Sequence, residues 1–142
     1  MKKIKWNPKF KPLPTDDNDE IFANGIFEFN ITRLIAFIGS NPSKFLLEKI
    51  DAQSLRNVTS SNLNESTIQS ASLSVPLIFA EISPGMFNII DGHHRLEKAH
   101  RDSVDTILVY RVYAEQHLAF LTSTRAYNAY IEYWNEKCTE IL

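Results

Sequence analysis

Five consecutive residues, Asp91-Gly92-His93-His94-Arg95, constrain the fold more than any other part of the chain. The apolar run Met86–Ile90 precedes them, and residues 96–101 continue with helical spacing. A strand that turns into a helix leaves backbone N–H groups and the positive end of the helix dipole at the turn, where anions bind. The imidazole and guanidinium groups of the segment add side-chain donors for phosphate oxygens. The sequence therefore predicts a strand, a phosphate-binding turn and a helix.

An ordinary helix start is the competing interpretation of the same five residues. An Asp followed by polar residues is typical of any exposed helix N-terminus. Two His and one Arg are unusual there, because cations in the first turn oppose the dipole, and an anionic ligand would reverse that penalty. The dipole and a charge-assisted hydrogen bond together contribute about 4 kcal/mol, the binding free energy of a millimolar site. Tighter binding would need a base pocket or Mg²⁺.

With its flanks, the segment Phe87–Ala99 resembles the signature of the ParB/sulfiredoxin superfamily. The resemblance covers about residues 75–113 and implies one α/β (α+β) domain, a small mixed β-sheet surrounded by helices, in which a Gly-x-x-Arg turn binds nucleotide phosphates. Sulfiredoxins place a nucleophilic Cys where this chain has His93, and the single cysteine here is Cys138, so sulfinic acid reduction is not expected. Free-serine kinases of the superfamily carry Asp-Gly-His-His-Arg, which this chain reproduces in full.

The resemblance to the free-serine kinases implies ATP, ADP or another nucleotide with Mg²⁺, and phosphoryl transfer to a small hydroxylated metabolite such as free serine. Such a transfer needs a carboxylate that accepts the hydroxyl proton. Asp91 beside the turn is the first candidate. Glu28 is the second, since those kinases place a glutamate from the N-terminal region opposite the turn, although an exposed strand residue between two buried Phe explains Glu28 equally well. The residues that bind the nucleotide are then Gly92, His93, His94 and Arg95.

Three other interpretations stay open. One is a non-catalytic module, in which nucleotide or a partner protein switches a loop and a basic arm contacts DNA or protein. Another is a metal-dependent nuclease, because some small nucleases have a Gly-His-His turn, but the spacing of His117 and Asn128 does not suit that pattern. The third is a transition-metal site, which adjacent His side chains at a helix start disfavour because they point in different directions. Its ligands would come from Asp91, His93, His94 and His100.

Charge separates the first 20 residues from the remainder of the chain. Five of the fifteen cations lie within the first eleven residues, and prolines and an acidic cluster follow them. Residues 1–20 are therefore predicted to form an extended arm, held by Trp6 and Phe10. Without these five lysines the chain has ten cations against seventeen acids, a net charge of −7, which makes a poor general surface for nucleic acid. Contact between the arm and nucleic acid is not favoured.

Residues 21–142 are predicted to form the ParB/sulfiredoxin-like domain. Asn30 can cap a helix that ends near Gly39, and Pro42 can begin a second helix that continues through Ile50. Eleven of the eighteen residues from 57 to 74 are Ser, Thr or Asn, which indicates a flexible loop that could cover the nucleotide, although plain disorder is the simpler account.

The second half of the domain reads as a hairpin, the motif helix, a strand and two helices. Val75–Ile82 and Met86–Ile90 flank the turn signal Ser83-Pro84-Gly85. Residues 106–113 give the strand after the motif helix, and a strand-helix-strand order implies parallel pairing across that unit. A short helix at 114–121 precedes a C-terminal helix whose aromatic stripe is assigned to the core. The stripe consists of Tyr127, Tyr130, Ile131 and Trp134.

Size and composition fit one globular domain, since the chain has 142 residues of which 44% are apolar. No apolar run reaches membrane-spanning length, and no signal pattern begins the chain, so no membrane association is expected. A single cysteine excludes an intramolecular disulfide and favours a cytoplasmic location. The expected partners are a nucleotide and a small-molecule substrate, and the sequence leaves the oligomeric state open.

Overall fold

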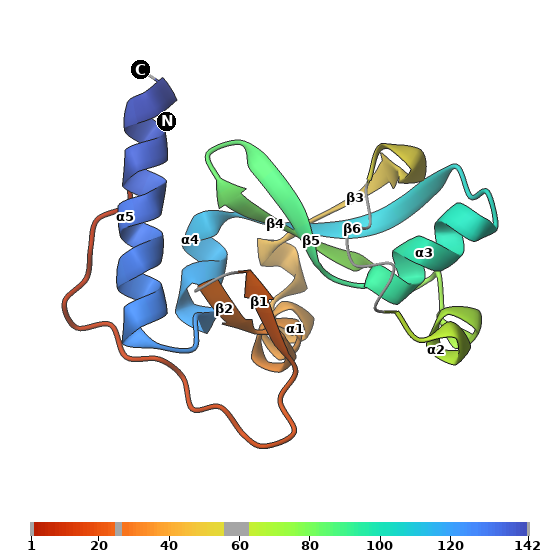
Figure 1. Cartoon of the computed structure of the whole chain (residues 1–142), viewed down its shortest axis with the longest axis horizontal. Coiled ribbons are helices and arrows are strands. Elements are labelled where there is room, and N and C mark those ends of the chain that lie inside the picture. The colour runs from red at the N-terminus through yellow and green to blue at the C-terminus, as the bar shows by residue number, and fades with distance from the viewer. Residues whose placement is uncertain (1, 25–26, 56–62, 142) are drawn as a thin grey trace. The chain divides into compact units, whose positions relative to one another are not determined.

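The computed structural model describes residues 2–24, 27–55 and 63–141 and has a mixed α/β architecture (Figure 1). The described residues group into two compact units. Unit 1 lies within Met1–Lys44, Ala80–Asn88 and Val112–Leu142, and unit 2 lies within Phe45–Phe79 and Ile89–Arg111. The expected α+β class is confirmed at this level, whereas the ParB/sulfiredoxin fold and a single domain over residues 21–142 stay predictions.

The strands form two sheets. The first sheet pairs β1 (Ile21–Asn24) with β2 (Phe27–Asn30), and the second has the order β3-β6-β4-β5. The strands of the second sheet are β3 (Leu46–Asp51), β4 (Leu77–Ser83), β5 (Met86–Asp91) and β6 (Thr106–Val112). The α-helices of the described residues are α1 (Ile31–Ser40), α2 (Glu65–Ser70), α3 (His93–Arg101), α4 (Ala114–His117) and α5 (Thr124–Ile141). Short 3-10 helices are η1 (Pro42–Lys44), η2 (Ala52–Ser54) and η4 (Leu118–Phe120).

The predicted start of helix α1 is confirmed. The Asn30 side chain accepts a hydrogen bond from Arg33 N at 3.0 Å, which satisfies one of the amides that a helix leaves unpaired at its start. Ile31 and Leu34 are fully buried, as their helical spacing indicates, but Ile35 is 44% exposed. The chain before it enters β1 at Ile21, the residue at which the folded part was predicted to begin.

Helix α5 supplies much of the core of unit 1, and the N-terminal arm runs along it (Figure 1). Both backbone groups of Ile4 bond the Asn135 side chain, with Oδ1 accepting from Ile4 N and Nδ2 donating to Ile4 O. The Phe10 ring stacks on Tyr127 with centroids 3.9 Å apart, whereas Trp6 is 53% exposed. The arm is thus extended and anchored. The core assignment of the aromatic stripe is confirmed, since at most 5% of each residue is exposed in the set Tyr127, Tyr130, Ile131 and Trp134.

A buried polar cluster joins three elements of unit 1. His117 on α4 has no exposed surface, and its Nε2 donates to the backbone O of Glu81 on β4 at 2.6 Å. The Tyr130 hydroxyl of α5 lies 3.0 Å from the same oxygen. The Glu81 carboxylate accepts from the backbone amides of Gly85 and Ala114. These donors and acceptors are paired, as the low-dielectric interior requires, whereas His117 Nδ1 is buried without a partner among the described residues.

The second predicted helix is wrong, because the residues from Pro42 to Ile50 form only the short η1 and then strand β3. β3 pairs antiparallel with β6 along its whole length, from Leu46 opposite Arg111 to Asp51 opposite Thr106. The ladder and an ion pair between Glu48 and Arg111 outweigh the weak helix preference of this stretch. Its leucines do not form a buried helical stripe either, since Leu46 and its neighbour are about half exposed.

The loop predicted at residues 57–74 is also wrong in part. α2 forms within it, with Asn64 as N-cap accepting from Thr67 N, and its Ile68 is 2% exposed. Residues 56–62 lie outside the described part of the chain. The predicted pairing across the motif helix is wrong too, because β6 lies between β3 and β4 and is not a neighbour of β5. The predicted hairpin of β4 and β5 is present.

Candidate functional site

The candidate site is the turn between β5 and α3 in unit 2, and Gly92 determines its shape. β5 ends at Asp91, α3 begins at His93, and Gly92 is the N-cap with φ 101° and ψ 24°. These angles are left-handed, a conformation that a side chain disfavours. A Cβ at position 92 would lie 2.8 Å from Leu77 Cγ and 2.9 Å from Arg95 Nη2, closer than such atoms approach. The strand-turn-helix prediction is confirmed, and only glycine fits its corner.

The start of α3 carries no side-chain cap within the described residues, because Gly92 has no side chain to offer. The first hydrogen bond of the helix runs from Leu96 N to Gly92 O at 2.9 Å. The N–H groups that precede it in the first turn have no acceptor inside the helix and carry the positive end of its dipole. No acidic residue stands in that turn. The turn therefore has the electrostatics of an anion site.

Arg95 folds back over the turn. Its Nη2 donates to Asp91 Oδ2 at 3.0 Å and to the backbone O of Pro76 at 3.3 Å. The two side chains of the ion pair are 20% and 14% exposed. Arg95 Nε is buried and has no hydrogen-bond partner among the described residues, which leaves one strong donor of the turn unsatisfied. The structure thus brings Asp91, Gly92 and Arg95 together.

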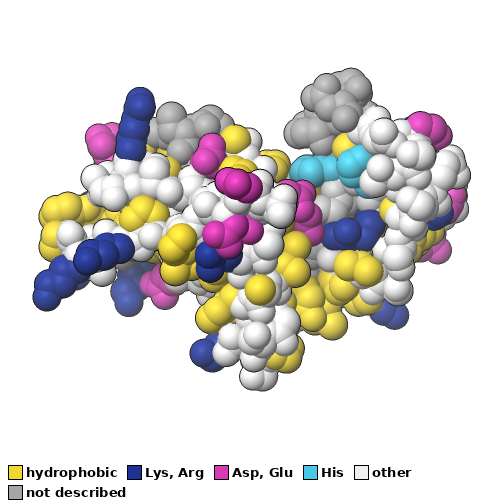
Figure 2. Space-filling view, turned by 90° about the horizontal axis from the view of Figure 1, so that it is seen from below, with side chains coloured by type: hydrophobic (Ala, Val, Ile, Leu, Met, Phe, Trp, Pro, Cys, Tyr) yellow, Lys and Arg dark blue, Asp and Glu magenta, His cyan; other side chains and the backbone are white. Residues whose placement is uncertain are grey.

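The two histidines of the motif differ in environment. Burial lowers the pKa of His93, against an opposing effect of the Asp91 carboxylate, and thus favours the neutral imidazole. His94 Nε2 accepts a hydrogen bond from Asn64 N at 3.2 Å. Both side chains are partly exposed, and Figure 2 shows imidazole groups at the molecular surface on the face that it draws. Because its Nε2 accepts, the His94 ring can offer the hydrogen of Nδ1 to a ligand.

Glu28 lies in the other unit, on β2. Its side chain is exposed, and its Oε1 accepts from Thr122 Oγ1 at 2.8 Å. Phe27 is half-buried and Phe29 fully buried, which matches the account of Glu28 as an exposed residue of a strand. Since Glu28 belongs to unit 1 and the turn to unit 2, the predicted place of Glu28 opposite the turn stays a prediction.

The residues considered for a metal or nuclease site have other roles in the described structure. His100 Nε2 bonds the backbone O of Ala52 at 2.8 Å, His117 belongs to the core of unit 1, and the Asn128 side chain accepts from Trp6 Nε1. Within the described ranges, no three His, Cys, Asp or Glu side chains form a group that could hold a metal ion. No helix of those ranges is long and apolar enough to cross a membrane.

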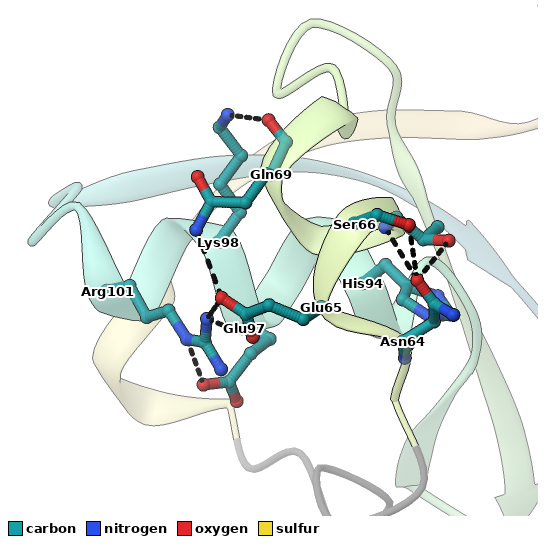
Figure 3. Close-up of polar contacts among 9 residues, drawn as sticks. Asn64, Glu65, Ser66, Gln69, His94, Glu97, Lys98 and Arg101 are labelled. Atoms are coloured by element: carbon teal, nitrogen blue, oxygen red, sulfur yellow. Dashed lines mark hydrogen bonds and ion pairs between the residues drawn. The ribbon is translucent and has the colours of Figure 1, made fainter.

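Sequence reasoning missed the neighbour of the motif helix, α2 (Figure 3). His94, Lys98 and Arg101 stand at helical spacing on one face of α3, and each bonds a residue of α2 or its N-cap. The Lys98 Nζ donates to Gln69 O at 2.8 Å in an exposed hydrogen bond. The signal was the spacing itself, since three basic residues at i, i+4 and i+7 form one stripe.

Comparison with family models, with curated proteins and with solved structures finds no match in any of the three. The likeness to the ParB/sulfiredoxin superfamily therefore depends on the motif and its flanks alone.

Proposed function

We propose that the chain binds the phosphate groups of a nucleotide at the start of α3, through Gly92, His93, His94 and Arg95. The observation that carries the proposal is the helix start itself, which has a left-handed glycine, no side-chain cap and no acid in its first turn. The first-turn amides without a cap and the positive end of the helix dipole both favour an anion at this position. A phosphate would accept hydrogen bonds from those amides.

The donor set fits a nucleotide such as ATP or ADP. Arg95 Nε is a buried donor without a partner in the described chain, and an unsatisfied donor of this kind costs about 1–3 kcal/mol, which a phosphate oxygen could recover. The phosphate oxygens, with the Asp91 carboxylate beside them, are the natural ligands for Mg²⁺. When bound, Mg²⁺ would neutralise the charge of the phosphates.

We further propose phosphoryl transfer to a small hydroxylated metabolite, free serine being the first to test. Arg95 orients the Asp91 carboxylate through their 3.0 Å ion pair. Asp91 would accept the proton of the attacking hydroxyl. The remaining chemistry needs only positioning and charge neutralisation, which amides, imidazoles and a guanidinium supply.

One observation favours a second candidate function, binding without transfer. The carboxylate nearest to the turn is held in an ion pair, and accepting a proton would weaken that pair with Arg95. A protein in which nucleotide binding changes contacts of the chain with DNA or a partner protein needs no such proton acceptor. Turnover separates the two candidates.

Calorimetry with Mg-ATP, Mg-ADP and pyrophosphate tests the binding step. We expect heat of binding at up to millimolar ligand, and affinity at least about fivefold weaker in His94→Ala. Lys49→Ala is the matched control, because it removes an exposed side chain of β3 in the same unit, outside the turn. Absence of heat with folded protein would defeat the proposal. Nucleotide consumption that depends on serine and is lost in Asp91→Asn would support the kinase, and binding without consumption would support the second candidate.

A further inference from the structure

The contact between His94 and Asn64 determines where the imidazole carries its proton. A backbone amide can only donate, so the 3.2 Å bond from Asn64 N requires a lone pair on His94 Nε2. The neutral ring then carries its hydrogen on Nδ1. A proton on Nε2 would place two donors face to face and break the contact. The structure thus selects one of the two tautomers of a residue in the candidate site.

Helix α2 is held against α3 by contacts other than this one (Figure 3). Arg101 Nη1 donates to both carboxylate oxygens of Glu65, at 2.7 and 2.8 Å. Lys98 Nζ donates to the backbone O of Gln69 at the other end of α2. Ile68, between these ends, is 2% exposed. These contacts fix the position of α2 on α3. They therefore place the Asn64 N–H beside His94 independently of the hydrogen bond to the imidazole.

We propose that the Asn64 N–H is a positioning group of the phosphate site, which acts by fixing the Nδ1–H tautomer of His94 and so keeping that proton available for a bound phosphate. The proposal rests on the proposed function for the phosphate, but the tautomer stands on the contact alone. The imidazole becomes a neutral donor with a set orientation. The site then needs no protonation of His94 to bind an anion.

Imidazole ¹⁵N NMR on the full chain reads the tautomer directly. We expect His94 Nδ1 to carry the proton in the unmodified protein, with Nε2 showing the shift of a nitrogen that accepts a hydrogen bond. Predominance of the Nε2–H form in folded protein would overturn the inference, whatever the protein binds. This measurement needs no variant and therefore does not depend on whether a substitution is tolerated.

Two variants at one position test the contact itself. Asn64→Pro removes the amide hydrogen and the capping side chain, whereas Asn64→Ala removes only the side chain, and the native φ of −86° lies close to the range of proline. We expect the Nδ1–H tautomer to persist in Asn64→Ala and to lose its dominance in Asn64→Pro. The pyrophosphate affinity of Asn64→Pro should be about two- to tenfold weaker than that of Asn64→Ala.

The tautomer role of Asn64 and the contact of His94 with phosphate can be refuted independently. Equal tautomer populations in both variants would overturn the positioning role of Asn64. A change of tautomer with unchanged pyrophosphate affinity would show that the Nδ1 hydrogen does not meet the phosphate and would overturn that half of the inference. If the unmodified protein binds no pyrophosphate, the proposed function fails and the assignment of the hydrogen to phosphate fails with it, while the NMR result still decides the tautomer.

Discussion

The two units differ in where their unpaired polar atoms lie. In unit 1, the buried His117 and Tyr130 both bond the backbone of β4, and side chains of α5 bond the backbone of the arm. The unpaired atom there, within the described residues, is the acceptor His117 Nδ1, which is enclosed in the core. In unit 2, the first turn of α3 has no side-chain cap in the described chain, and Arg95 Nε has no partner there. A polar group that stabilises a fold is paired within it, because leaving it unpaired costs free energy. The proposed phosphate site depends on the unpaired donors at the partly exposed turn of unit 2.

The largest effect is expected at the glycine of the turn. Gly92→Ala should lower the free energy of unfolding by about 3–4 kcal/mol, from the left-handed backbone and the crowding against Leu77. Gly39→Ala is the matched control, since a Cβ there meets no atom within 4 Å, and we expect it to be neutral or slightly stabilising. Chemical denaturation measures both. Equal stabilities of the two variants would mean that a Cβ at position 92 is not crowded by Leu77 and Arg95, contrary to the distances.

The buried polar cluster of unit 1, which contains His117, predicts that the protein loses stability in acid. Burial lowers the pKa of His117 to about 4 from its ordinary 6.5, so between these values the unfolded chain binds a proton that the folded chain does not. The contribution of His117 to the free energy of unfolding should therefore be fully present above pH 6.5. It should fall by about 3 kcal/mol as the pH falls to 4.

His117→Gln serves as the control for this acid effect, because an amide can still donate to Glu81 O but does not titrate in this range. Urea denaturation from pH 7 to 4 measures the two proteins together, and carboxylate titrations common to both cancel in the difference. Parallel stability curves would show that His117 is not enclosed, and the contrast between the two units would be lost.

The polar interior of unit 1 can be probed with a smaller change. Tyr130→Phe removes a buried hydroxyl that lies 3.0 Å from Glu81 O and 2.8 Å from Ile82 O, and it keeps the ring. We expect a loss of about 1–2 kcal/mol, because the two carbonyls lose their common donor. Tyr133→Phe, on the same helix but half-buried, is the comparison and should change little. Thermal unfolding ranks the two, and a reversed ranking would contradict the assignment of these bonds.

Local signals in the sequence identified the parts of the fold that local physics decides. The cap at Asn30, the apolar face of α1 and the Asp91-Gly92 corner need only neighbouring residues, and all three are present. Strand β3 could not be recognised, because its partner β6 lies far along the chain and no nearby residue distinguishes a strand from a helix there. Among the site residues, the pairing of Asp91 with Arg95 follows from their i, i+4 spacing.

The contacts of His94 lay beyond sequence reasoning for the same reason. Asn64 is thirty residues away from it, in a stretch whose composition resembles a loop, and α2 forms because Ile68 is buried. Propensity over six residues is too weak to predict such a helix, since short helices depend on packing. The motif could be found from the sequence, but the groups that orient its side chains come from distant segments.

The smallest effect on stability is expected at the hydrogen bonds between α5 and the N-terminal arm. Asn135→Ala removes both hydrogen bonds to Ile4 and leaves the Phe10 and Tyr127 rings stacked, so the free energy of unfolding should fall by about 1 kcal/mol or less. Hydrogen exchange at the Ile4 amide should become much faster, because its acceptor is gone.

The amides of the first turn of α3 should exchange fast in the unmodified protein and slow down only when pyrophosphate is added. Protection of those amides without any ligand would remove the difference between the two units, since it would show that the turn is already satisfied from within.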